Sequence, residues 1–248
     1  MKILFSNLGY ATGIDGTLGH HARKALRHAF QTKAMQHQVL LQFGAIIEQN
    51  DPDLCCLIEI DRGSAHSNAF NQIEALRSTN YPVFDIADKY GPRSRLSKMP
   101  FHHGKSNGFL SKVPLEFSHL YFESGSKRLI YKIQLAPELT LFFAHFSLSK
   151  KVRTKQFLEM RKLVESTTGQ VILLGDFNIF TGLGELEPLV AGNVLQLLNA
   201  PAVPTFRFHR WQHMLDLCLY SPSLAAEIKL SVIKQSFSDH DALLVELG

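Results

Sequence analysis

The stretch Val171-Ile172-Leu173-Leu174-Gly175-Asp176-Phe177-Asn178 is a short apolar run that ends in Gly-Asp-Phe-Asn. Its apolar part is typical of a buried β-strand, so the motif delivers polar groups to the mouth of that strand. Residues i and i+2 of an extended chain point to the same side, so Asp176 and Asn178 can converge on one ligand. A carboxylate suits a hard cation or proton abstraction, and an amide can hydrogen-bond a phosphoryl oxygen without adding negative charge. A plain strand-end turn is the alternative, because Gly, Asp and Asn are common turn residues.

Other apolar runs carry polar residues of the same kinds at their ends or within them. Burying a carboxylate without a partner is costly, so such residues need a cation, an acid partner or a ligand. Each one alone could be a satisfied strand-end residue, but together they favour an active site. The residues are Asn7, Glu59, His145, Asp216, Asp239 and His240.

Length and composition indicate a folded globular domain rather than a disordered chain. The 248 residues suffice for one large domain, which we expect to span 1–248. Apolar residues make up 45% and charged residues 19%, which are globular values. The formal net charge of +4 permits a phosphate-bearing substrate but does not by itself indicate nucleic acid.

The cysteines and the N-terminus favour a cytoplasmic protein. Cys55, Cys56 and Cys218 lie in apolar runs and show no spacing of a zinc site or disulfide framework, which favours a reducing compartment. The N-terminus enters a strand directly and lacks the apolar core of a signal peptide. No apolar stretch approaches the roughly 20 residues that a membrane span requires.

Strand-like runs recur along the chain, with helical patterns between some of them. Strand pairs without an intervening helix, at 108–122, 128–146 and 214–233, predict antiparallel hairpins, whereas helix-bridged strands predict some parallel pairing. The result is a mixed α/β domain with two layers of sheet and outer helices. Strands are expected at 2–7, 54–60, 108–111, 115–122, 128–135, 139–146, 171–176, 214–220, 227–233 and 242–247, and helices at 33–49, 66–78 and 151–166.

The remaining basic and glycine-rich segments carry weaker signals. The glycines of 8–32 form no phosphate-binding fingerprint, so a surface loop followed by a solvated basic helix is favoured over a substrate-facing loop. The pair His102-His103 lacks a third ligand at metal spacing and is read as a loop feature. Other basic groups are read as solvated faces, with the 150–155 group the most interesting because it follows His145. They are Arg93/Arg95/Lys98, Lys150/Lys151/Arg153/Lys155 and Arg207/Arg210.

Taken in order, the motifs resemble the endonuclease/exonuclease/phosphatase superfamily over nearly the whole chain. The Gly-Asp-Phe-Asn and Ser-Asp-His motifs, with Glu59 upstream, are the specific part of the match. The resemblance implies a four-layer α/β sandwich, with two mixed β-sheets packed face to face, helices outside, and a site at the strand ends between the sheets. The matching elements are Ser6-Asn7, Pro52-Asp53-Leu54, the run 106–115, Ala144-His145-Phe146, Gly175 to Asn178, Pro204-Thr205-Phe206, Leu215-Asp216 and Ser238-Asp239-His240.

The resemblance implies a divalent metal, Mg²⁺ or Mn²⁺, bound by Glu59 with help from Asn7 and Asp239. An oxygen-rich site of this kind suits these ions better than zinc. Gly9 departs from the pattern of relatives, many of which place another polar residue after the first Asn. The acidic residue or Tyr that some nucleases use between the Glu59 and His145 elements also lacks a clear counterpart, and 88–107 would have to supply it.

The resemblance also implies the catalytic roles. Asp176 would orient or deprotonate the attacking water, and Asn178 and His145 would hydrogen-bond the phosphoryl oxygens. His240, its ring held by Asp216, would form the acid–base pair beside the scissile phosphate. A carboxylate at the imidazole would fix its tautomer and raise its pKa, which favours the imidazolium next to an anionic phosphate.

We therefore expect a metal-dependent phosphoesterase that hydrolyses phosphodiesters, with nucleic acid among its candidate substrates. A nuclease would line its groove with basic residues, for which 20–28 and 150–155 are candidates. The alternatives are a phosphatase, or a phospholipid or inositol-phosphate phosphodiesterase, which would expose an apolar patch to which Phe101 and the Phe206/Phe208/Trp211 cluster could contribute. A non-catalytic binding module is less favoured, because the metal and His residues are all present.

Overall fold

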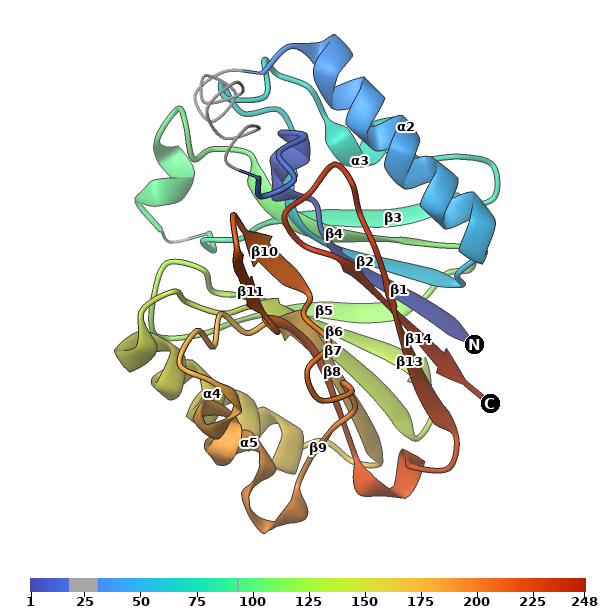
Figure 1. The fold of residues 1–248 in the computed structure, drawn as a ribbon, viewed down its shortest axis with the longest axis vertical. Helices are drawn as coiled ribbons and strands as arrows, with labels where there is room; N and C mark the ends of the chain where they lie inside the picture. Colours follow the sequence, from blue (N-terminus) through green and yellow to red (C-terminus); the bar gives the residue numbers. More distant parts are fainter. Residues whose placement is uncertain (18–30, 93) are drawn as a thin grey trace.

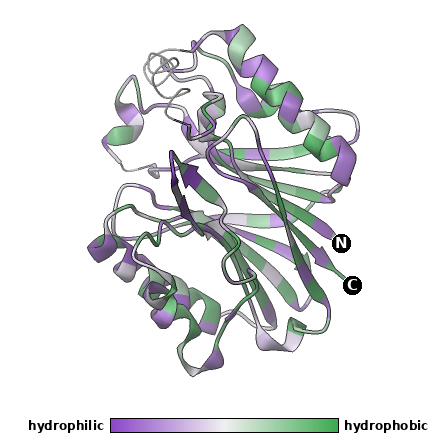
Figure 2. Cartoon of the chain, viewed as in Figure 1, coloured by the Kyte–Doolittle hydropathy of each residue, from purple (hydrophilic) through white to green (hydrophobic). Residues whose placement is uncertain are grey.

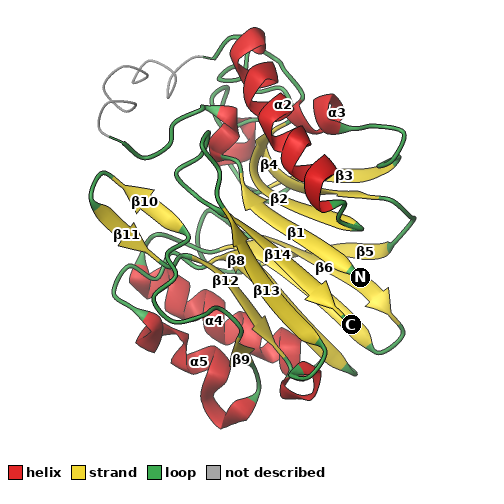
Figure 3. Ribbon diagram, turned by 45° about the vertical axis from the view of Figure 1, so that its right-hand side comes forward, coloured by secondary structure: helices red, strands yellow, loops and turns green. Residues whose placement is uncertain are grey.

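The structure, a computed structural model, describes residues 1–17, 31–92 and 94–248. Two six-stranded sheets lie face to face, and helices cover their outer faces (Figures 1 and 3). The expected four-layer sandwich with two mixed sheets is confirmed. The basic segment 20–28, a candidate for substrate contact, and Arg93 lie outside the described residues.

The first sheet joins the two ends of the chain, in the order β13-β14-β1-β2-β4-β3. β1 and β2 pair in parallel, and the other neighbours are antiparallel. Both parallel strands therefore end at the same edge of the sheet. The strands are β1 (Lys2–Asn7), β2 (Leu54–Asp61), β3 (Val83–Asp88), β4 (Lys105–Ser111), β13 (Ile228–Ile233) and β14 (Ala242–Leu247).

The second sheet comes from the middle of the chain, in the order β5-β6-β7-β8-β12-β9. β7 and β8 are its parallel pair, and a separate hairpin of β10 and β11 stands at the site-bearing edge of the sandwich (Figure 1). The strands are β5 (Glu116–Tyr121), β6 (Leu129–Ala136), β7 (Leu139–His145), β8 (Gln170–Asp176), β9 (Gln196–Leu197), β10 (Phe206–Phe208), β11 (Trp211–His213) and β12 (Asp216–Tyr220).

Helices form the two outer layers, where their apolar stripes meet the backs of the sheets. α2 places Val39 and Phe43 against residues of β1 and β2, and α4 places Phe157 and Met160 against the second sheet. Figure 2 shows hydrophobic and hydrophilic residues mixed along α2, as expected for a helix with one buried face. The helices are α2 (Lys33–Asn50), α3 (Gln72–Leu76), α4 (Lys150–Glu165) and α5 (Glu187–Val190).

The alternation of strand side chains builds the central core and an outer core at the same time. In β1, Ile3 and Phe5 point between the sheets, whereas Leu4 points toward α2. In the second sheet Tyr131 and Phe143 point inward, where their rings stack with centroids 4.5 Å apart. Because both faces of each sheet are covered, the central strands read as continuous apolar runs.

The predicted elements mostly occur, but two predicted hairpins do not. The run 128–146 is the antiparallel pair of β6 and β7, as predicted. The strands within 108–122 belong to different sheets, as do those within 214–233. A short connection can cross between stacked sheets as readily as it can form a hairpin, and strand spacing alone does not separate the two cases.

Two further differences concern the region after β2. The helix expected at 66–78 is only the five-residue α3, because Ser64 and Ser67 hydrogen-bond the Asp61 carboxylate and form a turn before it. β3 was not expected, since its apolar residues are interrupted by Asp85, which is bound by Tyr131 and His119 across the sandwich. No helix in the described ranges is long and apolar enough to cross a membrane.

Candidate active site

The polar residues singled out in the sequence gather at one end of the sandwich, where strands of both sheets stop. The parallel pairs end there with Asn7 and Glu59 in the first sheet and with His145 and Asp176 in the second. The antiparallel strand β12 begins there, because Asp216 pairs with Asp176. The Ser-Asp-His segment leads into β14 at the same edge. Strand direction thus brings together groups that are far apart in the sequence.

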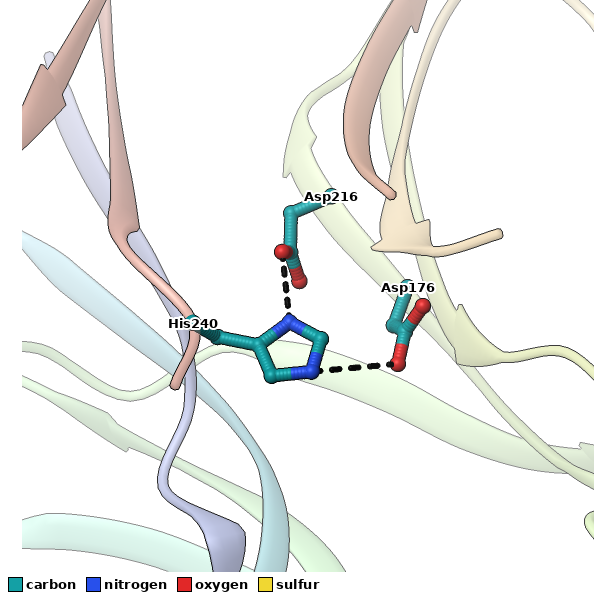
Figure 4. Close-up of side chains that lie close together, drawn as sticks. All are labelled: Asp176, Asp216 and His240. Carbon is teal, nitrogen blue, oxygen red and sulfur yellow. Dashed lines mark hydrogen bonds and ion pairs between the residues drawn. The ribbon is translucent and has the colours of Figure 1, made fainter. Parts of the chain in front are cut away.

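His240 lies between two aspartates, as Figure 4 shows. Its Nδ1 is 2.7 Å from Asp216 Oδ2, and its Nε2 is 4.0 Å from Asp176 Oδ2. Burial opposes a charge on the imidazole, but the Asp216 carboxylate, with further carboxylates nearby, raises the pKa of His240 to about 10. At neutral pH the proton of the pair therefore resides on His240.

Three contacts hold the Asp216–His240 pair in place. The backbone N–H of Asp216 donates to Thr205 Oγ1 at 2.8 Å, and the Phe206 ring lies 4.8 Å from the His240 ring. Beside them, Arg207 donates two hydrogen bonds of 2.8 and 2.7 Å to the Asp241 carboxylate. The prediction that Arg207 belongs to a solvated face is therefore wrong. Its side chain stabilises the loop that carries His240.

Asp176 is held as an ionised acceptor. Its Oδ1 accepts the backbone N–H of Asn178 at 3.0 Å, and its Oδ2 accepts the amide N–H of Asn7 at 3.3 Å. Burial opposes its charge, but the nearby imidazoles of His145 and His240 outweigh burial and lower the pKa of Asp176 well below its usual range. Asn178 has φ of 53°, and its amide donates to the Phe146 carbonyl at 2.9 Å, which fixes this left-handed turn.

Gly175 permits the close pairing beneath this turn. A Cβ at position 175 would lie 2.5 Å from the carbonyl oxygen of Ala144 in the neighbouring strand. The glycine of the Gly-Asp-Phe-Asn motif therefore lets β7 and β8 approach, which sets His145 opposite Asp176 in the register.

Glu59 reaches the site through a bulge. The register between β2 and β4 shifts between Leu57 and Ile60, and Glu59 has φ of 52°. A bulge of this kind redirects one side chain out of the regular alternation, here toward the strand ends. Backbone strain at both Glu59 and Asn178 is consistent with positions that the surrounding structure holds for function.

Basic side chains surround the Glu59 carboxylate. Its Oε1 lies 3.7 Å from Lys89 Nζ and 3.9 Å from Lys127 Nζ, and 3.6 Å from the imidazole of His145. Burial opposes ionisation of Glu59, but these three neighbours outweigh it and lower its pKa to about 2. Burial itself lowers the pKa of Lys89 to about 7, against the pull of Glu59.

His145 connects the two sides of the site. Its Nδ1 faces Glu59, and its Nε2 lies 3.3 Å from Asp176 Oδ2 and contacts Lys127. Burial and the charge of Lys127 lower the pKa of His145 to about 4, so the ring is neutral at pH 7.

Sequence reasoning missed the lysines and the tyrosine of this region. Lys89 lies just after β3, a strand that the sequence did not predict, and Lys127 lies in the polar connection just before β6. Tyr10 hydrogen-bonds Lys89, and the Lys105 ammonium sits 4.5 Å from its ring centroid. The segment 88–107, from which an acidic residue or a Tyr was expected, places Lys89 and Lys105 near Glu59.

The other basic and His groups have structural or peripheral places. Arg153 is buried and donates to the carbonyls of Ser147 and Leu148 at 2.9 Å. The prediction that it belongs to a solvated face is therefore wrong. It also pairs with Glu185, which ties α4 to the loop after β8. His103 bonds the carbonyl of Ser97 through Nδ1.

A cavity of about 220 Å³ opens beside Glu59, and Asp239 and Lys105 are also in its wall. Asn7 lies behind it, since its side-chain oxygen accepts the N–H of Gly9, another wall residue. Two carboxylates and an amide oxygen form a hard, oxygen-rich donor set, and the low pKa of Glu59 keeps that carboxylate ionised. These residues fit Mg²⁺ or Mn²⁺.

A second group could also hold a cation. Ligand atoms of Asp176, Asp216 and His240 all lie within 4.8 Å of one another. The 2.7 Å hydrogen bond between Asp216 and His240 commits both to each other, so the donor set around Glu59 is the better candidate.

Fold and site together define a two-sheet α/β sandwich with buried carboxylates and imidazoles gathered at its strand ends. The family model of the Endonuclease/Exonuclease/phosphatase family matches residues 35–240. The chain therefore belongs to the Endonuclease/Exonuclease/phosphatase family, whose members hydrolyse phosphate esters. Comparison with curated protein sequences finds no match.

Solved structures with this fold differ in what they act on. The endonuclease domain of TRAS1, a telomere-specific non-LTR retrotransposon, has a TM-score of 0.60 and 16% identity, with 99% of this chain and 97% of that chain covered. Sphingomyelinase C from Streptomyces griseocarneus has a TM-score of 0.66 and 14% identity, with 100% of this chain and 99% of that chain covered. The mannosyl-6-phosphatase Bt3783 of Bacteroides thetaiotaomicron has a TM-score of 0.61 and 15% identity, with 100% of this chain and 99% of that chain covered. These likenesses show the fold and leave the substrate open.

Proposed function

We propose that the protein is a divalent-metal-dependent phosphodiesterase that acts on nucleic acid or a nucleotide-like ester. The observation that carries the proposal is the buried line of Asp216, His240 and Asp176, with an imidazolium held between two carboxylates. Such a group stabilises negative charge that develops on a phosphoryl oxygen, and burial strengthens its effect.

Each residue has a role that follows from its contacts. Asp176, ionised and held on both oxygens, orients the attacking water. His240 donates from Nε2 to a phosphoryl oxygen, while Asp216 fixes the ring through Nδ1. His145 is neutral and provides a second donor, and the amide of Asn178 has a further N–H beyond the one bound to Phe146.

The metal would be held by Glu59, Asp239 and Asn7. When bound, the ion neutralises charge on the phosphate and lowers the pKa of a coordinated water. Lys89 and Lys127 balance the charge of the carboxylates at the same place, and they are positioned to contact the substrate phosphate.

A second candidate, a phospholipid phosphodiesterase, is favoured by one observation. The β10–β11 hairpin next to the site exposes Phe208 by 43% and Trp211 by 59%. Exposed aromatic side chains on a hairpin suit contact with a lipid surface.

Hydrolysis assays with three substrates test the proposal. Bis-p-nitrophenyl phosphate, p-nitrophenyl phosphate and plasmid DNA are incubated with Mg²⁺, Mn²⁺ or EDTA. We expect diester cleavage that requires metal and that Asp176→Ala abolishes. The matched control is Glu116→Ala, an exposed carboxylate of β5 at the opposite end of the second sheet.

Each outcome decides between the candidates. Turnover of the monoester alone would make the protein a phosphatase. Cleavage of sphingomyelin vesicles in the absence of nuclease activity would favour the lipid enzyme. No turnover, together with no metal binding by calorimetry, would contradict a metal-dependent esterase altogether.

A further inference from the structure

A larger cavity lies next to the site and has no part in the roles above. Its volume is about 650 Å³, and Arg62, Asp88, Lys98, His103 and Tyr121 are among its lining residues. It opens between the end of β3 and the end of β5, on the same side of the sandwich as the catalytic groups. A cavity of this size can hold a nucleotide-sized group.

Three segments of the chain contribute to this cavity and to the site within a few residues. β2 supplies Glu59 to the site, and Arg62 follows three positions later. Asp88 lines the cavity, and the next residue, Lys89, lies 3.7 Å from the Glu59 carboxylate. The same short segments of chain therefore line both hollows and form a shared wall between them.

A third connection comes from the loop before β4. His103 lines the larger cavity, and Lys105 lines the smaller one beside Glu59. The backbone between them is fixed, because the Arg62 N–H donates to the Gly104 carbonyl at 2.9 Å. A Cβ at Gly104 would lie 2.7 Å from the Ser64 backbone nitrogen, so the shared wall is closely packed.

The charges of the larger cavity favour an anion. Arg62 and Lys98 form no ion pair within the described residues, so two cationic side chains face one carboxylate, that of Asp88. His119, which also lines the cavity, is already paired with Asp85 at 2.7 Å. An excess of unpaired cations in a concave surface raises the local concentration of phosphate groups.

The Asp88 carboxylate in this cavity favours a ligand that also carries a hydrogen-bond donor. Its Oδ1 accepts the N–H of Tyr90 at 2.8 Å, while its Oδ2 is buried and has no hydrogen-bond partner in the part of the chain that the structure describes. A buried carboxylate oxygen without a donor is costly, so a ligand with a hydroxyl or amine group satisfies it. The ring of Tyr121 offers a flat face close by.

We propose that this cavity is a subsite for a second phosphate of the substrate, carried on a sugar unit next to the scissile phosphate. Arg62 and Lys98 bind that phosphate, and Asp88 accepts a hydrogen bond from a sugar hydroxyl or base amine. The inference rests on the proposed function and narrows it to nucleotide-like substrates with adjacent phosphates. A choline phosphodiester carries no second phosphate and gains nothing from this subsite.

The ratio of kcat/KM for two matched substrates tests the subsite. Thymidine 5′-(p-nitrophenyl phosphate) has one phosphate, and its 3′-phosphorylated form adds a second at the neighbouring position. We expect kcat/KM to be about tenfold or more higher for the phosphorylated form, a typical effect of one charge-assisted contact. Arg62→Ala should bring the ratio close to one. Lys229→Ala, an exposed lysine of β13 at the far end of the first sheet, should keep the wild-type ratio.

Binding without turnover separates this inference from the proposed function. Calorimetry with thymidine 3′,5′-bisphosphate in EDTA should show binding that Arg62→Ala and Lys98→Ala weaken about tenfold each. Binding of inositol 1,4-bisphosphate with equal strength would move the ligand from a nucleotide to a phosphorylated polyol and overturn the nucleotide assignment. Equal kcat/KM for the two thymidine esters would overturn the subsite but leave a phosphodiesterase. Bisphosphate binding lost in Arg62→Ala, with neither ester turned over, would support the subsite and contradict the proposed reaction.

Discussion

The two sides of the site hold their charges differently. Asp216 and His240 share a direct hydrogen bond of 2.7 Å and are both buried. On the other side, Lys89 and Lys127 lie 3.7 and 3.9 Å from the Glu59 carboxylate. One side is a closed pair, and the other is an open group of ions beside a cavity.

The difference in distance means that one side of the site has a fixed geometry, whereas the other side can adjust. A short buried hydrogen bond fixes one proton and one ring orientation, so the Asp216–His240 pair enters the reaction already arranged. Ions held at a longer distance can shift when a metal or a phosphate enters between them. On the proposed function, we therefore expect the closed pair to act mainly on the rate of the chemical step, and the open group to act mainly on the affinity for metal and substrate.

The largest expected effect comes from breaking the closed pair. His240→Gln keeps a hydrogen-bond donor near Asp216 but removes the positive charge, so kcat should fall on the order of 10⁴-fold, with KM changing little. Steady-state kinetics with bis-p-nitrophenyl phosphate measures the split. The control is His37→Gln, an exposed histidine of α2. A loss below tenfold would show that His240 does not act in the chemical step.

A smaller effect is expected from the open group. Glu59→Gln should weaken the apparent affinity for Mg²⁺ by about 100-fold, because one anionic ligand is lost. High Mg²⁺ should then restore much of the activity, whereas it should not rescue His240→Gln. Metal titration of the two variants side by side makes the comparison. If saturating Mg²⁺ restores neither variant, Glu59 belongs to the chemical step as well.

The smallest expected effect is a change in the pKa of His240, which can be measured without following activity. The Cε1 proton of His240 should report an imidazolium up to about pH 9 and titrate near pH 10 in nuclear magnetic resonance spectra without metal. In Asp216→Asn the carboxylate with the largest raising effect is gone while burial remains, so the pKa of His240 should fall well below that of the wild type. Titration of His240 near 6.5 in both proteins would show that Asp216 does not hold the proton on the ring.

The same shift has a consequence for stability. The folded-state pKa of His240 is raised above its unfolded value, so its contribution is fully present below about pH 6.5. That contribution is lost as the pH rises toward 10. The urea midpoint of the wild type should therefore fall over this range, and that of His240→Gln should fall less.

The sequence predicted the fold and the closed pair better than the open group. Asp176 ends an apolar run and Asp216 lies within one, so both could be singled out locally, whereas the pairing of Asp216 with His240 was implied by the family resemblance. Lys89 and Lys127 could not be singled out, because they meet Glu59 only after β3 and β6 are placed in different sheets. The bulge that redirects Glu59 also depends on the pairing of β2 with β4 and leaves no local pattern.

The sheets differ in how the chain supplies them, and this affects when the site can form. The second sheet comes from one continuous stretch, 116–220, whereas the first needs both ends of the chain, since β1 pairs with β14. Ser238, which donates to the Asn7 carbonyl at 2.9 Å, is 231 residues away from it in the sequence. The edge of the first sheet that carries the candidate site can therefore close only after this contact between distant segments has formed, so we expect the site to be completed late in folding.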